Sequence, residues 1–511
     1  MKHIHLLCFT VALLGAVTCG KSSDPDNSGP EAPAKTTFTF DAQLVSDVPP
    51  ASAPAAKATV GALDGSNKRR MLWEDGDKIT VFSKADFDPD NVDGTKNMAG
   101  YLFQTSLEGP SSSATFSSDA AFPVSDEYIA VYPPIEGTKT VNFSSHQMVQ
   151  FTIPHEQMLP EEGGFDKKAA VAVACAPGRN SLAFKNTTAL IRFRVSDSDI
   201  VAGWIETGEV PADKETNNIA GGYRINLDFD NNEADLDQYG SSPYYNRIDF
   251  TIDGSTPFRT GTDYYIVVRP ATLTEGFRLY LNGYLVESFT NAKCGAFEKK
   301  KIYNVGTLTK AGATEILLNF PFHDATVADA LLNYETNVWP GSSQSYTSGT
   351  SADDAKVNGD PWTCSYTLFG TPYYFISASC TNTSSFNRPY INSSASNSGP
   401  NMPFPYRRYL ALPKVSGYTL STVTITVNKS QNANWMPMIG TALGNSTILP
   451  DAATGGSTQT VTFANNTSCS FNLTGQEDQT GGTYYWIGNG GLGSQYAFWI
   501  SNLQLTYTKV N

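Results

Sequence analysis

The stretch Ala189-Leu190-Ile191-Arg192-Phe193-Arg194-Val195 predicts a β-strand. From Ile191 onward, large apolar residues alternate with arginines, and a period of two places successive side chains on opposite faces of a sheet. Similar alternating runs occur on both sides of it, at residues 78–82, 127–132, 264–268 and 422–427. Turn-forming Gly, Pro, Asn and Asp separate these runs at short intervals. We therefore expect an all-β protein made of antiparallel β-sandwiches.

Composition limits the number of domains and the classes of partner. A chain of 511 residues is too long for one hydrophobic core and suggests about three domains. The formal net charge is −14, and there is no basic cluster. Because nucleic-acid binding needs Lys and Arg to displace counterions from phosphates, the sequence predicts no nucleic-acid partner. After the N-terminal segment, no apolar run is long enough for a transmembrane helix.

The N-terminus has the features of an export signal. Lys2 and His3 give a basic start, and the apolar residues 6–17 lead to Ala16-Val17-Thr18-Cys19. A helix needs about 20 apolar residues to span a bilayer, and this run is shorter, so it predicts a secretory segment. It resembles a bacterial lipoprotein signal, which implies that Cys19 is acylated and becomes the first residue of the mature protein. An ordinary signal peptide cleaved near Ala16 is the alternative.

Residues 20–35 predict a disordered tether between a lipid anchor and a folded body. They contain no aromatic residue and no large apolar residue, so they cannot bury enough surface to offset the entropy of ordering. Asp24 and Asp26 resemble part of the surface-export signal of lipoproteins. We therefore expect a protein that is anchored by lipid in the outer membrane and exposed on the cell surface.

Residues 36–196 carry three sequence blocks in a characteristic order. They are W-x-x-G-D-x-I-x-V at 73–81, Y-x-A-x-Y-P at 128–133 and I-P-x-E-Q at 153–157. Their order and spacing resemble the N-terminal domain of the fimbrillin-like family of surface lipoproteins. Residues 197–310, with D-Y-Y-I-V-V-R-P at 263–270, are similar to the second fimbrillin domain. The resemblance implies two tandem transthyretin-like β-sandwiches and assembly with other fimbrial subunits by strand exchange.

The resemblance also implies a proteolytic step. In fimbrillins an early strand is removed after an arginine of the first domain, and a strand of a partner subunit fills the vacated groove. Main-chain hydrogen bonds supply the affinity in such β-augmentation. Lys68-Arg69-Arg70 lies just before the Trp73 block, which makes Arg69 and Arg70 the candidate processing site. A plain exposed basic turn is the alternative.

A short linker of small residues, 311–314, leads to a third body at 315–511. Three sequence features of this body are the pattern L-P-x-x-x-G-Y-x-L at 412–420, V-T-I at 423–425 and the terminal L-x-L-T-Y at 503–507. Together they resemble galactose-binding-like jelly-roll modules. The resemblance implies a C-terminal jelly-roll β-sandwich, and the residue pattern itself predicts an all-β sandwich with polar and aromatic loops.

Aromatic and amide residues of the third body suggest a glycan-binding site. A sugar ring presents apolar C–H faces that stack on aromatic rings, while its hydroxyls need directional polar partners. Filling of the sandwich core is the alternative role, and we favour it for Trp499 and Tyr507 on the last strand. The candidate glycan-binding residues are Trp362, Trp435, Trp486, Tyr485, Asn434 and Asn489.

Signatures of catalysis and of metal binding are absent from the sequence. It has no H-E-x-x-H, C-x-x-C or G-x-S-x-G motif and no phosphate-binding loop, so we expect no enzyme activity, no cofactor and no metal. Two acidic segments, 86–94 and 228–237, could supply oxygens to calcium, but solvated turns are the favoured interpretation. Cys364 and Cys380 could pair across neighbouring strands, and free buried thiols are the alternative.

Together these features predict a non-enzymatic surface adhesin. The resemblance implies that the end of the second domain is the donor strand in stalk fimbrillins, but here it continues into a whole further domain. We therefore expect a fimbrial tip or accessory subunit whose C-terminal module binds a glycan or a host-surface receptor. The alternative is a monomeric glycan-binding surface lipoprotein of a polysaccharide-uptake system. We expect the third body, 315–511, to fold on its own.

Overall fold

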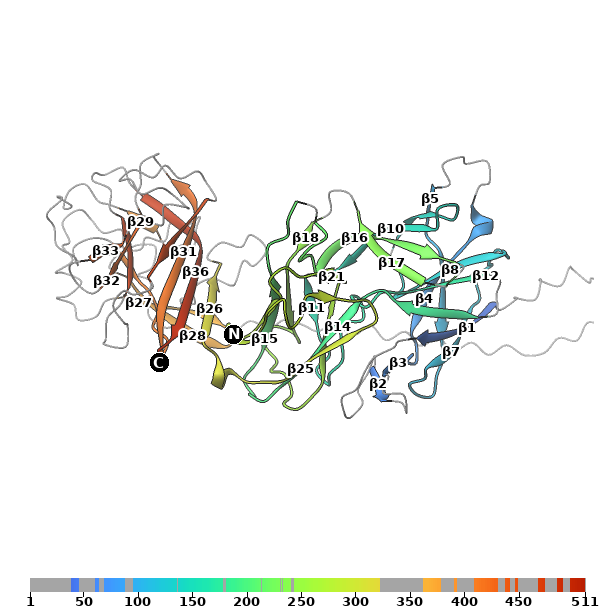
Figure 1. The fold of residues 1–511 in the computed structure, drawn as a ribbon, viewed down its shortest axis with the longest axis horizontal. Coiled ribbons are helices and arrows are strands. Elements are labelled where there is room, and N and C mark those ends of the chain that lie inside the picture. Colours follow the sequence, from blue (N-terminus) through green and yellow to red (C-terminus); the bar gives the residue numbers. More distant parts are fainter. Residues whose placement is uncertain are drawn as a thin grey trace, which may run out of the picture.

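The computed structural model describes residues 38–45, 60–63, 69–87, 95–135, 137–177, 181–212, 214–229, 231, 233–239, 243–321, 362–377, 390–392, 409–430, 437–441, 446–448, 467–473, 485–489 and 497–510. In these ranges the regular structure is β-strand, apart from two 3₁₀ turns, η1 (Lys84–Asp86) and η2 (Lys310–Gly312). The predicted all-β fold of packed sheets is confirmed. The described strands form an elongated molecule, with β1 to β8 toward one end and β27 to β36 at the other (Figure 1).

The first sheet closes on itself as a barrel, which the sequence did not predict. Its strand order is β1 (Phe38–Val45), β13 (Leu182–Asn186), β12 (Ala172–Pro177), β8 (Glu127–Tyr132), β4 (Lys78–Ser83), β6 (Tyr101–Thr105) and β7 (Ser113–Ser118). Strand β1 closes the barrel because it pairs antiparallel with β7 and parallel with β13. A separate pair, β2 (Val60–Leu63) and β3 (Arg69–Met71), lies between β1 and β4 in the chain.

Trp73 is the centre of the core beneath the barrel sheet. Its side chain has no exposed surface. The rings of Phe116, Tyr132 and Phe184 pack edge-on against it, with centroids at 4.9, 5.2 and 5.2 Å. Edge-to-face packing at such distances is favourable for aromatic pairs. The W-x-x-G-D block therefore fixes the point at which the chain returns to the barrel before β4.

Sheets of the first two bodies interleave across residue 196. One six-stranded sheet runs β17 (Glu233–Gln238), β16 (Ala220–Asp228), β10 (Gln147–Ile153), β9 (Lys139–Asn142) and β5 (Thr95–Met98), with β18 (Tyr244–Tyr245) paired to β16. In turn β14 (Ala189–Val195) lies between β20 (Tyr264–Val268) and β25 (Ile302–Leu308). Each body thus contributes strands to a sheet of the other, while the boundary at 196/197 stays a prediction.

One large apolar core is shared by these interleaved sheets. It contains Ile129 and Val173 from the first body together with Ile205 and Phe250 from the second. Because burial of apolar area is the main stabilising contribution to folding, a core that both bodies share couples their stability. A small pair of strands, β21 (Ala271–Thr272) and β24 (Ala296–Phe297), completes this region.

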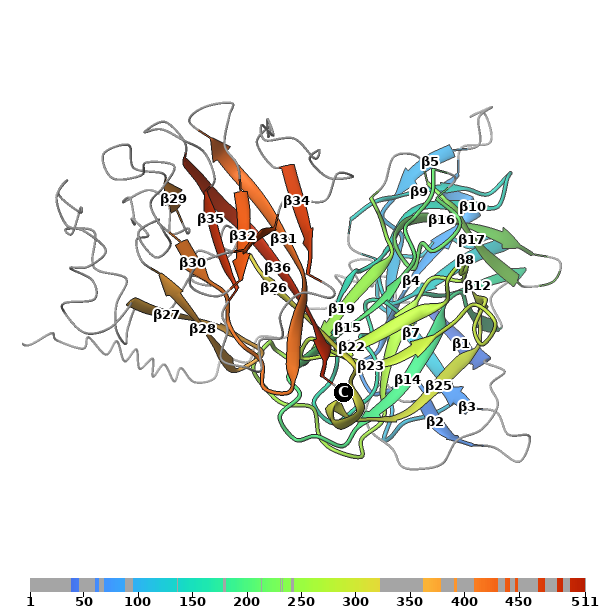
Figure 2. The same ribbon diagram turned by 60° about the vertical axis from the view of Figure 1, so that its left-hand side comes forward.

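A ten-stranded sheet runs from the second body into the C-terminal body (Figures 1 and 2). Its order is β11 (Glu156–Met158), β19 (Arg247–Thr251), β15 (Ala202–Thr207), β22 (Phe277–Leu281), β23 (Tyr284–Phe289), β26 (Glu315–Phe320), β36 (Ala497–Lys509), β31 (Tyr418–Ser430) and β34 (Thr467–Asn472), with β29 (Tyr390–Asn392) beside β36. The step between the two bodies is β23 to β26.

A six-stranded sheet completes the C-terminal body. Its order is β27 (Trp362–Leu368), β28 (Thr371–Ser377), β30 (Tyr409–Ala411), β35 (Trp486–Asn489), β32 (Pro437–Thr441) and β33 (Ser446–Ile448). A separate apolar core of this body includes Phe320 and Leu505 from the long sheet and Phe375 and Ile487 from this one. The two sheets therefore pack as a sandwich.

The segment predicted as a linker is packed rather than free. Ala313 is 2% exposed, and its carbonyl accepts a hydrogen bond from the buried Tyr418 hydroxyl at 2.8 Å. The Thr314 carbonyl accepts from the Lys509 amide at 2.8 Å. Ala313 is the buried residue of this segment, while Ala311, Gly312 and Thr314 are exposed.

Candidate ligand-binding end of the C-terminal body

The strand register defines two ends of the six-stranded sheet. Neighbouring strands from β27 to β32 run antiparallel, with Trp362 opposite Ser377, Tyr409 opposite Gly488 and Asn489 opposite Pro437. The start of β27, the end of β35 and the start of β32 therefore lie at one end, which we call the open end. At the other end, the docked end, the turn Phe369–Gly370 joins β27 to β28 beside the second body.

Two candidate glycan-binding residues lie at the open end. Trp362 begins β27 and Asn489 ends β35, three strand positions apart in the sheet order. At the usual spacing between strands, β27 and β35 are about 14 Å apart. Trp486 lies at the start of β35, three residues before Asn489. The sheet thus collects residues that are far apart in the sequence.

The other candidates divide into two groups. Trp435 and Asn434 lie outside the described residues and precede Pro437, the first residue of β32, in the sequence. Tyr485 is fully buried in the core of the C-terminal body, so its side chain is not part of an exposed site. Tyr507 is also fully buried, as expected, and its hydroxyl donates to the Pro413 carbonyl at 2.7 Å.

The candidate processing residues Arg69 and Arg70 lie on β3, paired with β2. Directly after them, Trp73 exchanges two main-chain hydrogen bonds with Ser111, at 2.7 and 2.9 Å. Upstream of them lies β1, whose register comprises six residue pairs with β7 and four with β13. A cut after Arg70 would therefore separate a barrel strand from the rest of the chain.

Charged groups hold the chain firmly just after the candidate processing site. The Lys167 ammonium bridges Glu74 at 2.8 Å and Asp77 at 3.1 Å, and Asp77 is 8% exposed. The Tyr132 hydroxyl lies 3.5 Å from the Asp77 carboxylate. Burial, and then the nearby carboxylates, raise the pKa of Tyr132 well above its ordinary value, so the phenol stays protonated. This cluster ties the W-x-x-G-D block to Lys167 and Tyr132.

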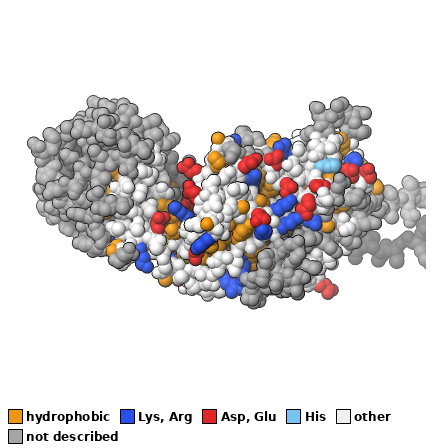
Figure 3. All heavy atoms as spheres, viewed as in Figure 1, with side chains coloured by type: hydrophobic (Ala, Val, Ile, Leu, Met, Phe, Trp, Pro, Cys, Tyr) orange, Lys and Arg blue, Asp and Glu red, His pale blue; other side chains and the backbone are white. Residues whose placement is uncertain are grey.

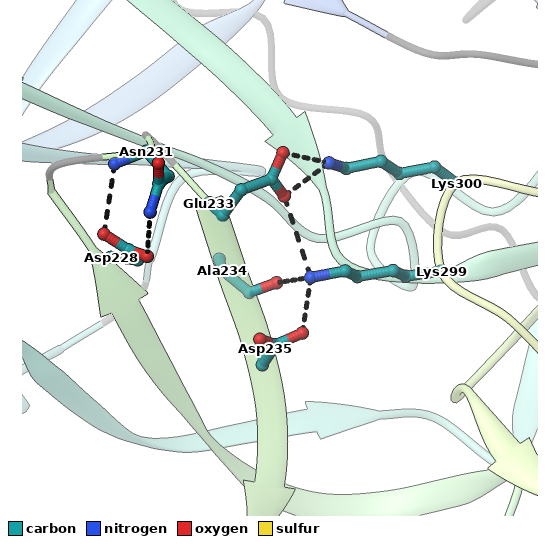
Figure 4. Close-up of polar contacts among 7 residues, drawn as sticks. All are labelled: Asp228, Asn231, Glu233, Ala234, Asp235, Lys299 and Lys300. Carbon is teal, nitrogen blue, oxygen red and sulfur yellow. Dashed lines mark hydrogen bonds and ion pairs between the residues drawn. The ribbon is translucent and has the colours of Figure 1, made fainter.

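Two lysines pair with carboxylates of the acidic segment 228–237 (Figure 4). The Lys300 ammonium pairs with Glu233, and the Lys299 ammonium pairs with Asp235 at 2.5 Å and lies 3.7 Å from Glu233. Burial alone would raise the pKa of Glu233, but the hydrogen bond and charge of Lys300 hold it below its ordinary value. Asp228 instead accepts from the amide and side chain of Asn231. These carboxylates are thus engaged by protein groups.

No group of three or more His, Cys, Asp or Glu side chains in the described part of the chain could hold a metal ion. In the first acidic segment, Asp86 accepts a hydrogen bond from the Tyr101 hydroxyl at 3.3 Å, and residues 88–94 lie outside the described ranges. On the face shown in Figure 3, basic and acidic side chains are interspersed over the first two bodies.

The cysteines that the structure describes with their side chains are buried thiols. They are Cys175, Cys294 and Cys469. Burial raises the pKa of Cys175 and of Cys469 to about 12, so neither is a reactive thiolate at neutral pH. Cys364 lies on β27 opposite Phe375, while Cys380 lies outside the described residues.

Cys19 and the predicted tether also lie outside the described residues. Among the described residues, no helix is long and apolar enough to cross a membrane.

One structural residue of the I-P-x-E-Q block was missed at the sequence level. Gln157 is 1% exposed, and its side-chain amide donates to the Val267 carbonyl at 2.7 Å and accepts from the Val267 amide at 3.0 Å. It therefore completes the hydrogen bonds of strand β20 as a neighbouring strand would. The signal that the sequence offered was its place in the I-P-x-E-Q block, directly before the apolar Met158 and Leu159.

Comparisons with known proteins identify no family. No protein-family model matches the chain, and no curated protein matches it. A solved structure of a proposed cell adhesion protein from Bacteroides uniformis is 15% identical, with a TM-score of 0.32, and the match covers 55% of this chain and 96% of that one. A second, from Bacteroides ovatus, is 13% identical with a TM-score of 0.30, over 54% and 95% of the two chains. Likenesses at this level do not establish a shared fold or function.

Proposed function

We propose that this protein is a non-enzymatic cell-surface adhesin whose C-terminal body binds a glycan or a host-surface receptor at its open end. The observation that carries the proposal is the placement of Trp362 and Asn489 at the end of the sheet opposite the docked end. A binding surface there points away from the rest of the molecule. Aromatic and amide residues are the types that recognise the apolar faces and hydroxyls of a sugar.

A glycan array probed with the soluble mature chain tests this role. We expect binding to a restricted set of glycans, and at least a tenfold loss of affinity in Trp362→Ala and in Asn489→Ala. Thr367→Ala is the matched control, because Thr367 is an exposed residue on the same strand near the docked end. Equal binding by all three variants, or no bound glycan or host protein, would contradict the proposal.

We further propose that the protein joins a fimbrium as a tip or accessory subunit, anchored in the outer membrane through Cys19. Two features support this. Strand β1 lies upstream of Arg69 and Arg70 and between two barrel strands, so its removal would leave a strand-shaped groove for a partner. The end of the second body, β25, is paired with β14 over six residue pairs and is followed by a further body, so this segment is not free to fill a neighbour's groove.

The alternative, a monomeric glycan-binding lipoprotein of a polysaccharide-uptake system, is distinguished by its assembly state. High-mass ladders that survive mild denaturation support subunit exchange. A purified native protein that binds glycans and remains a monomer with an intact N-terminal segment supports the alternative.

A further inference from the structure

The second body has an aromatic surface on the side of its sheet that faces away from its core. On β15 and β22, Ile205 and Leu279 belong to the core and are fully buried. Trp204 and Tyr280 alternate with them and therefore point to the opposite face. Nevertheless, Trp204 is only 3% exposed and Tyr280 only 1%. Something other than the core of the second body must cover them.

The covering groups come partly from the C-terminal body. The Tyr280 ring stacks on Trp204 with centroids 4.6 Å apart and planes at 12°, and the Arg247 guanidinium lies 4.3 Å from the Trp204 centroid. The Phe369 ring, from the turn between β27 and β28, lies 6.3 Å from Trp204 at an angle of 29°. Phe369 has φ of 53°, a conformation that large residues rarely adopt, and Gly370 follows with φ of 73°. The turn thus presents an aromatic ring to the second body.

Main-chain pairing continues across the same contact. Tyr284 on β23 lies opposite Ile316 on β26, and the Leu317 amide donates to the Gly283 carbonyl at 2.8 Å. A Cβ at Gly283 would lie 2.9 Å from the Leu317 carbonyl oxygen and 3.6 Å from the Phe369 ring. Glycine is therefore required for the two bodies to approach this closely.

Polar and aromatic contacts surround this pairing. The Tyr280 hydroxyl donates to Glu315 at 3.1 Å, on the first residue of β26. The Tyr284 ring packs edge-on against Tyr418 of β31 at 6.1 Å. Within the second body, the Lys310 ammonium lies 5.4 Å from the centre of the Tyr284 ring and donates to Asp199 at 2.5 Å, which holds the end of this body beside Tyr284. A hydrogen bond and an aromatic contact thus join the two bodies beside the main-chain pairing.

We propose that the Trp204 surface is a docking site for the C-terminal body of the same chain, and that the second and C-terminal bodies unfold as one cooperative unit. The occupant is the Phe369–Gly370 turn together with β26. The C-terminal body is then held in one orientation, whatever ligand it binds, because a ring-on-ring contact, a sheet pairing and a packed connection all restrain it. This inference does not depend on the proposed adhesin function.

Hydrogen–deuterium exchange of the full mature chain in increasing denaturant tests the proposal. We expect peptides from β22 and β23 (277–289) and from β36 (497–509) to lose protection at the same denaturant concentration. Loss of protection in β36 at clearly lower denaturant than in β22 and β23 would overturn it, whatever the variants do.

A matched pair of variants tests the part played by the turn. Phe369→Asn removes the ring but keeps a residue that tolerates positive φ. We expect it to separate the two transitions, with β36 opening first, and to increase exchange at the Leu317 amide. Thr367→Ala, on the exposed side of the same hairpin, should leave both transitions together. If Phe369→Asn keeps a single transition and an unchanged Leu317 amide, the Phe369 contact is not the docking contact.

Discussion

Gln157 shows how one buried side chain joins two bodies that the sequence presents as separate. Its amide occupies both hydrogen-bonding groups of Val267 on β20. Gln157→Leu has nearly the same size but cannot bond, so it leaves a buried N–H and a buried C=O without partners. We expect it to lower the free energy of unfolding by about 2–4 kcal/mol, measured by denaturant titration. Gln104→Leu, at an exposed position on β6, should change it by roughly 0.5 kcal/mol or less. Equal effects of the two substitutions on the free energy of unfolding would show that the hydrogen bonds of Gln157 to Val267 do not stabilise the fold.

Glu233 gives the second prediction at this scale, and its sign follows from its pKa. The folded-state pKa lies below the ordinary value of 4.5, because Lys300 favours the charged carboxylate. Its contribution to stability is therefore present above pH 4.5 and is lost as the pH falls through the folded-state pKa. We expect Glu233→Gln to be less stable than the wild type at pH 7, and we expect this difference to shrink as the pH falls below 4.5. Glu275→Gln, at an exposed position, is the control. A stability difference for Glu233→Gln that does not shrink at low pH would contradict the pairing.

From the sequence we could predict which residue types a glycan-binding site needs, but not which of those side chains are buried in the core. Tyr485 and Trp486 are adjacent in the sequence, and both were candidates for sugar stacking. The structure places Tyr485 in the core, since the alternation of β35 turns it and Ile487 toward the opposite sheet. Which face of a short strand is buried depends on the sheet that packs on it. The four residues of β35 alone do not show which face that is.

At the scale of elements, alternation predicted the strands well but could not predict their partners. The run 189–195 is a strand, yet its neighbours β20 and β25 begin 75 and more residues later in the chain. Period two states which side chains share a face, while pairing depends on long-range packing. For this reason only the structure could show three features of the fold. They are the interleaving of the first two bodies, the closure of the barrel by β1 and the step from β23 to β26.

The position of β1 gives the prediction that belongs to this scale. If the chain is processed after Arg69 or Arg70, the released segment includes β1, and a strand-shaped opening remains between β7 and β13. We expect an arginine-specific protease to convert the precursor to a form that begins at Arg70 or Met71, and the double variant Arg69→Ala, Arg70→Ala to stay intact. Intact-mass spectrometry measures both products.

The consequence of that cut can be measured separately. A synthetic peptide with the β1 sequence, Phe38–Val45, should bind the processed protein and not the unprocessed one, because only the former offers the opening. Processing without any gain in peptide binding would show that β1 stays in place after cleavage, which would remove the structural basis for strand exchange.

At the scale of the whole molecule, the anchor is a prediction from the sequence alone. We expect Cys19→Ser to move the protein from the membrane fraction to the soluble fraction, because the diacylated thiol would be lost and one uncharged hydroxyl cannot hold a protein at a bilayer. Fractionation followed by mass spectrometry of the mature N-terminus measures this. An unmodified mature start at another residue would show that Cys19 is a bystander in an ordinary signal peptide.

The ten-stranded sheet has a mechanical consequence if the protein is the surface adhesin proposed above. The strands of the C-terminal body run between its open end and its docked end, and the chain enters that body through β26, which lies along β36 over six residue pairs. A force applied at the open end is therefore directed along the strands. It loads the hydrogen bonds between β26 and β36 in shear, so these bonds share the force instead of breaking one after another. If the C-terminal body binds a particle as proposed above, drag on that particle would be passed to the second body as torque through the Trp204 contact.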